Sequence, residues 1–155
     1  MTEYPVVNWI FRAEKGDERM YIAALDESTD DRGLSFSILF PHLARIGRIR
    51  DVHIGEIRPG KVRGNHYHAI RQEIVAVIAR GRWSLHWDTG AETLTHTRTF
   101  EAGAIVVVPP RNWSHAVRND GTESLWIVAA SDQVYDRHES DPVARDAIHR
   151  MVVQP

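Results

Sequence analysis

Short apolar or alternating segments, each ended by turn-forming residues, constrain the fold of this chain more than any other feature. Turns are favoured by Pro59-Gly60, by Arg80-Gly81 and by Asn119-Asp120-Gly121. Segments of this length, at a spacing of roughly 8–12 residues, are typical of a β-sandwich or a β-barrel. The sequence therefore predicts an all-β fold, with strands expected at 6–11, 21–25, 34–40, 52–57, 74–79, 82–87, 93–100, 105–108 and 124–130.

Two segments depart from this pattern. The acidic run from Asp26 to Asp31 is expected to form a loop. Near the C-terminus, Asp141 is a good N-cap and Pro142 suits the first helical position. An apolar stripe at helical spacing follows at Val143, Ala147, Ile148 and Met151. We therefore expect a short C-terminal helix that begins at Asp141 and docks through this stripe.

Composition excludes several classes of protein. The 155 residues are enough for one domain with a real core, and we expect a single domain over 1–155. The net charge of -2 argues against a nucleic-acid binder, which would carry a basic face. There is no cysteine, which excludes disulfides and thiolate metal sites. No apolar run approaches the length of a membrane span, and the N-terminus lacks the pattern of a secretion signal, so we expect a cytoplasmic protein.

Three histidines and one glutamate form the candidate site. His66 and His68 are two residues apart, so on a strand they point to the same face, about 7 Å apart. Glu73 would return on the next strand, and His115 would come from a later one. If the sheet closes into a barrel, all four converge inside it. Three imidazoles and a carboxylate suit a divalent transition metal such as zinc, iron, manganese or nickel.

The same residues resemble the two sequence motifs of the cupin superfamily. Gly60, His66, His68 and Glu73 resemble the first motif, and the second is matched by Gly103, Pro110, His115 and Asn119. The interval from Glu73 to Gly81 is one residue longer than usual, so either the strand bulges or Gln72 takes the place of Glu73. Asn112 stands where the second motif usually has glycine, and asparagine tolerates the left-handed conformation. The resemblance implies a double-stranded β-helix, the cupin jelly-roll barrel.

A further resemblance is to the sugar-nucleotide branch of the cupins. It rests on Asp31-Arg32-Gly33, on the stretch from Val62 to His68, and on the stretch from Ala129 to Asp136, together with Phe36, Phe40 and Trp113. That branch includes dTDP-4-keto-6-deoxysugar epimerases, 3,4-ketoisomerases and cupin domains of capsular polysaccharide enzymes. The resemblance implies a homodimer, often with swapped N-terminal strands, and a nucleotide sugar as the ligand.

The implied function is isomerisation or epimerisation of a nucleotide-linked keto-deoxysugar in polysaccharide biosynthesis. His66 or His68 would take the proton next to the ketone, Tyr135 would act as an acid, and Arg63 would hold the diphosphate. A structural ion pair for Arg63 and a surface contact for Tyr135 are the alternatives. The epimerases and ketoisomerases generally use such histidines without a metal, whereas some capsular domains bind zinc there. We expect a metal, zinc foremost, at His66, His68, Glu73 and His115.

A second class of function is compatible with the same motifs. A metal cupin of this size could instead be a small-molecule oxygenase, or a binding or sensor module without catalysis. Arginines that converge on a long groove would favour the nucleotide sugar, whereas a closed apolar pocket would favour a small substrate.

Overall fold

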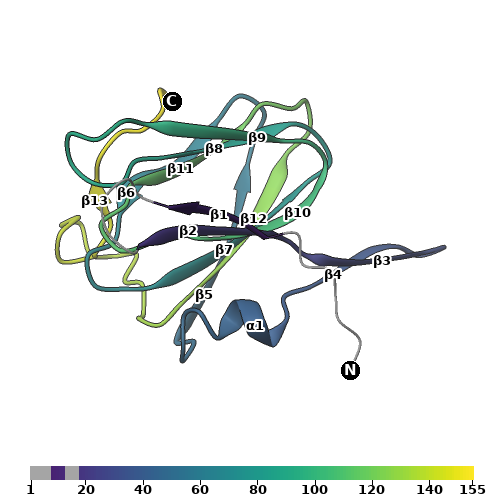
Figure 1. The fold of residues 1–155 in the computed structure, drawn as a ribbon, viewed down its shortest axis with the longest axis horizontal. Coiled ribbons are helices and arrows are strands. Elements are labelled where there is room, and N and C mark those ends of the chain that lie inside the picture. The colour runs from purple at the N-terminus through teal and green to yellow at the C-terminus, as the bar shows by residue number, and fades with distance from the viewer. Residues whose placement is uncertain (1–7, 13–17) are drawn as a thin grey trace.

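The computed structural model describes residues 8–12 and 18–155, and most of its strands form two large antiparallel sheets (Figure 1). The six-stranded sheet has the spatial order β1 (Asn8–Arg12), β2 (Arg19–Ala24), β10 (Gly103–Val108), β7 (Glu73–Ala79), β12 (Leu125–Ser131) and β5 (Asp51–Ile57). The five-stranded sheet has the order β13 (Ile148–His149), β6 (Val62–Tyr67), β11 (His115–Asn119), β8 (Trp83–Trp87) and β9 (His96–Phe100). Residues 6 and 7 of the first predicted strand lie outside the described residues.

The chain passes repeatedly from one sheet to the other. β5, β7, β10 and β12 lie in the six-stranded sheet, whereas the strands between them, β6, β8, β9 and β11, lie in the five-stranded sheet. This alternation is that of a jelly roll, so the predicted all-β fold is confirmed. Strands from distant parts of the sequence become neighbours, and β6 lies directly beside β11.

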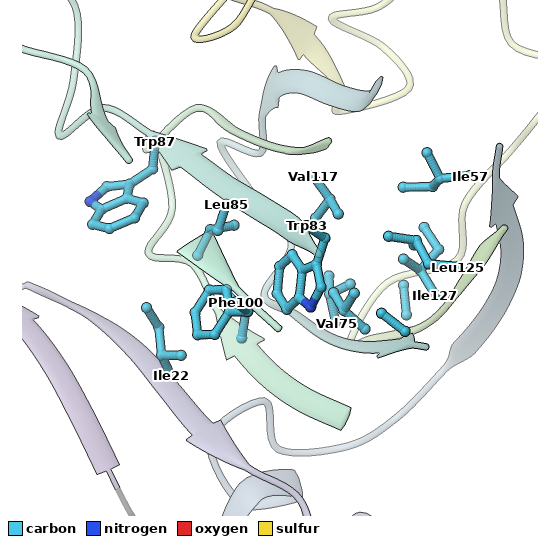
Figure 2. Close-up of a cluster of buried hydrophobic side chains, with 14 of the residues drawn as sticks. Ile22, Ile57, Val75, Trp83, Leu85, Trp87, Phe100, Val117, Leu125 and Ile127 are labelled. Carbon is cyan, nitrogen blue, oxygen red and sulfur yellow. The ribbon is translucent and has the colours of Figure 1, made fainter. Parts of the chain in front are cut away.

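The main core fills the space between the two sheets (Figure 2). Trp83, Leu85 and Trp87 point inward from β8 and are buried, as their alternation with polar residues predicts. Trp83 stacks on Phe100, with ring centroids 4.4 Å apart. Aromatic side chains therefore supply much of this core, and Leu85 of β8 also lines a cavity.

A second apolar cluster covers the outer face of the six-stranded sheet. Ile74, Ala76 and Val106 point into it, and Phe36 and Ile38 from the segment after β3 pack against it. β7 is therefore buried on both faces, which explains why residues 74–79 are apolar without alternation. The short helix α1 (Phe40–Leu43) directly precedes β5 in the sequence, and its His42 side chain is buried against Tyr21.

Two predictions about the N-terminal third are wrong. The acidic run expected to be a loop forms β3 (Asp26–Asp30), which pairs with β4 (Gly33–Ser37) in a separate two-stranded sheet. This hairpin extends away from the barrel (Figure 1), and its strand β3 is exposed, so charged side chains cost little there. The strand expected over 34–40 ends at Ser37, and α1 begins at Phe40. Among the described residues, no helix is long and apolar enough to cross a membrane.

The predicted C-terminal helix is also wrong beyond its first turn. Asp141 does cap a turn, since its carboxylate accepts the backbone N–H of Val143. The turn ends at Asp146, whose φ of 55° is left-handed, and the chain then enters β13. Of the expected docking stripe, Ala147 is buried, whereas Val143 and Met151 are exposed. The cap was recognisable from the sequence, but the residue that stops the helix was not.

Candidate metal centre

His66, His68, Glu73 and His115 converge at one point inside the barrel. One ligand-type atom from each residue lies within 4.8 Å of the corresponding atoms of the other three. His66 lies on β6 and faces His115, the first residue of β11, directly across the ladder. His68 follows the end of β6, and Glu73 is the first residue of β7. The convergence expected from strand parity is therefore what the fold produces.

The carboxylate of Glu73 lies among the three imidazole rings. Its Oε2 atom is 3.3 Å from Nε2 of His68 and 3.5 Å from Nε2 of His115. The ring centroid of His66 lies 4.9 Å from that of His68 and 5.2 Å from that of His115. Ligand atoms that surround a zinc ion tetrahedrally at about 2.1 Å are roughly 3.4 Å apart. The spacing of the donor set therefore fits a small divalent cation.

Hydrogen bonds on the far side of two rings fix which nitrogen faces the carboxylate. His68 donates from Nδ1 to the backbone carbonyl of Asp146 at 2.5 Å, and His115 donates from Nδ1 to the carbonyl of Trp113 at 3.2 Å. A carbonyl only accepts, so Nδ1 carries the proton in both rings. Both Nε2 atoms then point at Glu73.

The surroundings of the cluster favour an ionised Glu73 and a neutral His66. Burial alone would raise the pKa of Glu73, but hydrogen bonds and charge interactions with His115 and His68 outweigh it and hold that pKa well below its usual range. Burial, together with the neighbouring His115 and His68, lowers the pKa of His66 to about 3. At neutral pH Glu73 is thus ionised and His66 is neutral, the forms in which both ligate metals. A carboxylate facing Nε2 atoms requires either protons on those nitrogens or a cation among them.

The cluster opens into a cavity of about 860 Å³. Buried apolar side chains line its inner part: Val75, Leu85, Val107, Val117, Ile127 and Ala129. Exposed or half-buried polar side chains line its outer part: His53, Arg63, Tyr135 and Arg137. Asp51 and the exposed Val52 and Ile54 also line the cavity. Its floor is therefore apolar and its mouth is mixed, with Arg63 and Arg137 as the exposed cations, and the four ligand-type residues lie on its wall.

The other residues expected in the site have definite places. Arg63 lines the cavity, and its Nε donates to the backbone carbonyl of Glu56 at 2.8 Å. Tyr135 also lines the cavity, with its ring centroid 4.9 Å from the guanidinium carbon of Arg71. Gln72 lies outside the cluster, because its side chain donates to the carbonyl of Pro109. The carboxylate in the cluster is therefore Glu73.

Sequence reasoning missed two residues beside the site. Arg71 lines the cavity although it is only 4% exposed, and its charge contributes to the lowered pKa of His66. Its closeness to Glu73 in the sequence was a usable signal. Asp146 holds His68 through its backbone carbonyl. No local pattern marked it, because it stood within a segment expected to be helical.

Three comparisons connect this site to known proteins. A UDP-2-acetamido-2,6-beta-L-arabino-hexul-4-ose reductase from Pseudomonas aeruginosa is 33% identical over 89 residues, which is 56% of this chain and 23% of the reductase. The capsular polysaccharide assembling protein CapF from Staphylococcus aureus superposes with a TM-score of 0.55 at 19% identity, covering 83% of this chain and 33% of CapF. The chain thus spans less than a third of the reductase and about a third of CapF.

A smaller neighbour matches more completely. The dTDP-6-deoxy-D-glucose-3,5-epimerase from Legionella pneumophila, solved in complex with dTDP-4-keto-L-rhamnose, has a TM-score of 0.59 at 15% identity, over 83% of this chain and 73% of the epimerase. These likenesses confirm the cupin jelly roll. The model of the polysaccharide biosynthesis C-terminal domain family matches residues 28–143, a range that holds all four cluster residues. The chain therefore belongs to the polysaccharide biosynthesis C-terminal domain family.

Proposed function

We propose that this chain is a metal-dependent cupin that binds a nucleotide-linked keto-deoxysugar and isomerises or epimerises it. One observation carries the proposal. An ionised carboxylate and three imidazoles converge on a point in the wall of a cavity that Arg63 and Arg137 also line. The ligands would be His66, His68, Glu73 and His115, and zinc is the leading metal because imidazole and carboxylate donors at this spacing suit it.

A metal here would act as a Lewis acid that polarises the ketone of the substrate. The protein's own residues would do the rest. An imidazole whose Nε2 binds a metal has no lone pair left to take a proton, since its Nδ1 already carries one in His68 and His115. Proton transfer would then fall to other groups at the cavity wall. His53 is the candidate base that would remove the proton, and Tyr135 is the candidate acid that would return one. Without a metal, His66 or His68 would be the base, as in our first expectation.

The mouth of the cavity supports an anionic substrate. The exposed Arg63 and Arg137 line it, and the buried Arg71 lines the same cavity. A guanidinium binds a diphosphate through paired hydrogen bonds, and Arg63 uses its Nε for the Glu56 carbonyl, which leaves its terminal nitrogens to meet the phosphates. The names of two relatives agree with this class, since one is a reductase of a UDP-linked sugar and the other an epimerase solved with a dTDP-linked sugar.

Metal analysis and calorimetry together test the proposal. We expect close to one equivalent of a divalent metal in protein purified without chelators, and binding of dTDP- or UDP-sugars below millimolar concentration. Arg63 is exposed in the free protein, so its effect depends on the bound substrate covering the guanidinium. If the substrate pairs with it there, Arg63→Ala should weaken binding about thirtyfold, which corresponds to about 2 kcal/mol. Arg82→Ala is the matched control, since Arg82 is exposed and does not line the cavity.

Catalysis has its own readout. Solvent deuterium should enter the sugar next to the ketone, and Tyr135→Phe should slow this exchange if the tyrosine is the acid. Less than a tenth of an equivalent of metal, after growth in metal-supplemented medium, would contradict the proposed metal binding. The histidines would then act as acid and base without a metal. The homodimer expected from the resemblance belongs to the same proposal and is checked by light scattering.

The apolar floor of the cavity favours one alternative. Val75, Leu85 and Val107 would suit a small apolar substrate as well as the methyl group of a deoxysugar. If metal binds and no nucleotide sugar does, a metal cupin of the oxygenase or sensor type is the better account.

A further inference from the structure

The last part of the chain lies across the wall of the metal centre. Residues 141–153, here called the C-terminal strap, pair with β6 through β13, where His149 faces His66 and Ile148 faces Tyr67. The strap runs beside β6 at one end of the barrel (Figure 1). Its far end is fixed by the buried Asn65, whose side-chain oxygen accepts the backbone N–H groups of Val152 and Val153. The strap is therefore attached to the strand that carries the first ligand.

Asp146 is the point at which the strap meets the ligand loop, residues 68–72. Its carboxylate accepts the backbone N–H of Ala69 at 2.7 Å, of Ile70 at 3.2 Å and of Arg71 at 2.8 Å. Its backbone carbonyl accepts Nδ1–H of His68 at 2.5 Å and a terminal N–H of Arg71 at 3.3 Å. The residue is 8% exposed and adopts a φ of 55°, which turns carbonyl and carboxylate toward the same loop.

We propose that Asp146 is a positioning residue of the metal centre, which fixes the ring orientation and the tautomer of His68. The side chain anchors the turn on the ligand loop, and the carbonyl then holds the imidazole with Nδ1 protonated and Nε2 directed at Glu73. The part of this inference that concerns metal affinity rests on the proposed function. The part that concerns the tautomer stands on the hydrogen bonds alone.

His115 shows why the dependence is specific to His68. The ring of His115 is held by the carbonyl of Trp113, two residues earlier on the same stretch of chain. The ring of His68 is held by a residue 78 positions later. Loss of the strap anchor should therefore disturb one ligand and leave another in place, which predicts weaker metal binding rather than loss of the site.

The substitution that tests this should leave the barrel folded. Ala69 and Ile70 are exposed, so their N–H groups can bond to water when the carboxylate is removed, whereas the N–H of the buried Arg71 loses its acceptor. Asp146→Ala removes all three side-chain bonds and the 3.7 Å ion pair with Nε of Arg71, and it disfavours the left-handed φ. Asp146→Asn keeps the shape, tolerates that φ and retains one accepting oxygen. Asn119→Ala is the control, because Asn119 is 2% exposed and bonds Ile57 and Glu123, not the ligand loop.

Zinc affinity, thermal unfolding and histidine ring spectra are measured for the four proteins. Competition with a chromophoric chelator should give a tenfold to hundredfold loss of zinc affinity for Asp146→Ala, a smaller loss for Asp146→Asn and none for Asn119→Ala. Long-range nitrogen–proton spectra of metal-free protein at pH 8 should show His68 protonated at Nδ1 in the wild type. Asp146→Ala should show a mixture of the two tautomers.

Two results would overturn the inference. In one, Asp146→Ala retains both the zinc affinity and the tautomer of the wild type. In the other, Asn119→Ala and Asp146→Ala lower the melting temperature equally and also lose the same zinc affinity. The loss of affinity would then reflect general destabilisation. If the wild type binds no zinc, the proposed function fails, and the spectra still decide whether Asp146 sets the tautomer. If Asp146→Ala does not fold, Asp146→Asn takes its place, and its zinc affinity and His68 tautomer are compared with those of the wild type and Asn119→Ala.

Discussion

The barrel centre and the C-terminal strap hold the same cluster by different means. In the centre, His66 and His115 face each other across the ladder of β6 and β11, so backbone pairing sets their positions. The strap has only two residues in a strand, β13, and acts mainly through side chains such as Asp146 and Arg150. A backbone ladder distributes its hydrogen bonds over many residues, whereas the strap concentrates them in a few. A single side-chain substitution in the strap should therefore have a measurable effect. In the barrel centre, only a substitution at a point where two strands approach each other closely should do so.

Gly64 is the place in the centre where the backbones are closest, and we expect the largest effect there. A Cβ at this position would collide with the carbonyl oxygen of His115 and lie 2.7 Å from Cα of Ala116, and the φ of 110° is itself unfavourable for other residues. Gly64→Ala should cost about 3 kcal/mol or more of unfolding free energy, because the ladder that aligns His66 and His115 must separate. Denaturant unfolding measures the cost.

Gly81→Ala is the control for Gly64→Ala. The nearest atom to a Cβ at Gly81 lies 3.7 Å away, an ordinary contact. This variant should lose at most about 1 kcal/mol. Equal losses for the two variants would mean that the close approach of β6 and β11 is not what constrains the site.

Zinc binding should stabilise the whole molecule and should couple the stability of the strap to that of the barrel centre. A ligand present at a hundredfold excess over its dissociation constant raises the unfolding free energy by about 2.7 kcal/mol. Because His68 connects the metal to Asp146, hydrogen exchange should slow at 69–71 and at the strap amides as well as in β6 and β11. Protection confined to β6 and β11 would show that the strap is energetically separate from the site.

Asp88 tests the strap at its other end. Both of its oxygens bond Arg150 at 2.6 Å, and the carboxylate is buried. Asp88→Asn keeps an oxygen for the N–H groups of Gly90 and Ser114 but leaves the Arg150 charge without its partner. We expect a loss of about 2 kcal/mol in denaturant unfolding.

Asp30 provides the matched control for Asp88. It pairs with Arg32 on the β3–β4 hairpin, where both side chains are exposed. Asp30→Asn should leave the denaturant midpoint of unfolding unchanged, because an ion pair in full contact with solvent contributes little. If Asp88→Asn proves equally mild, the strap is held by its backbone contacts and by Asn65 rather than by this ion pair.

The same contrast explains what the sequence could and could not predict. Most strands of the barrel were found because alternation and turn residues are local signals. β6 and β11 were expected only as the strands that carry His66 and His115, which followed with His68 from strand parity and motif spacing, and their bounds were not predicted. The choice between Gln72 and Glu73 was open, because the extra residue before Gly81 allowed two registers. Only the contact of Gln72 with Pro109, across the fold, decides it.

The strap was misread for a physical reason. Its first residues, Asp141 and Pro142, carry a true cap signal, and the expected helix has the right beginning. The helical turn ends at Asp146, whose φ of 55° is left-handed. There the carboxylate accepts three backbone N–H groups of the distant ligand loop. β3 was missed in a similar way, since an acidic segment forms a strand only because β4 pairs with it. Long-range partners, which leave no periodicity, decide both cases.

The smallest expected effect is at the cap of the strap, Asp141. Its carboxylate accepts one N–H, that of Val143, at an exposed position. N-cap removal usually costs about 1 kcal/mol in a full helix, and here only one turn follows, so Asp141→Ala should cost about 0.5 kcal/mol. Zinc affinity should stay unchanged, since the anchor at Asp146 does not depend on the first turn. Denaturant unfolding and chelator competition on the same samples check both values. A loss of affinity comparable to that of Asp146→Ala would mean that the turn from Asp141 to Asp146 acts as one rigid unit, and that the position of His68 is set by the whole strap rather than by a single residue.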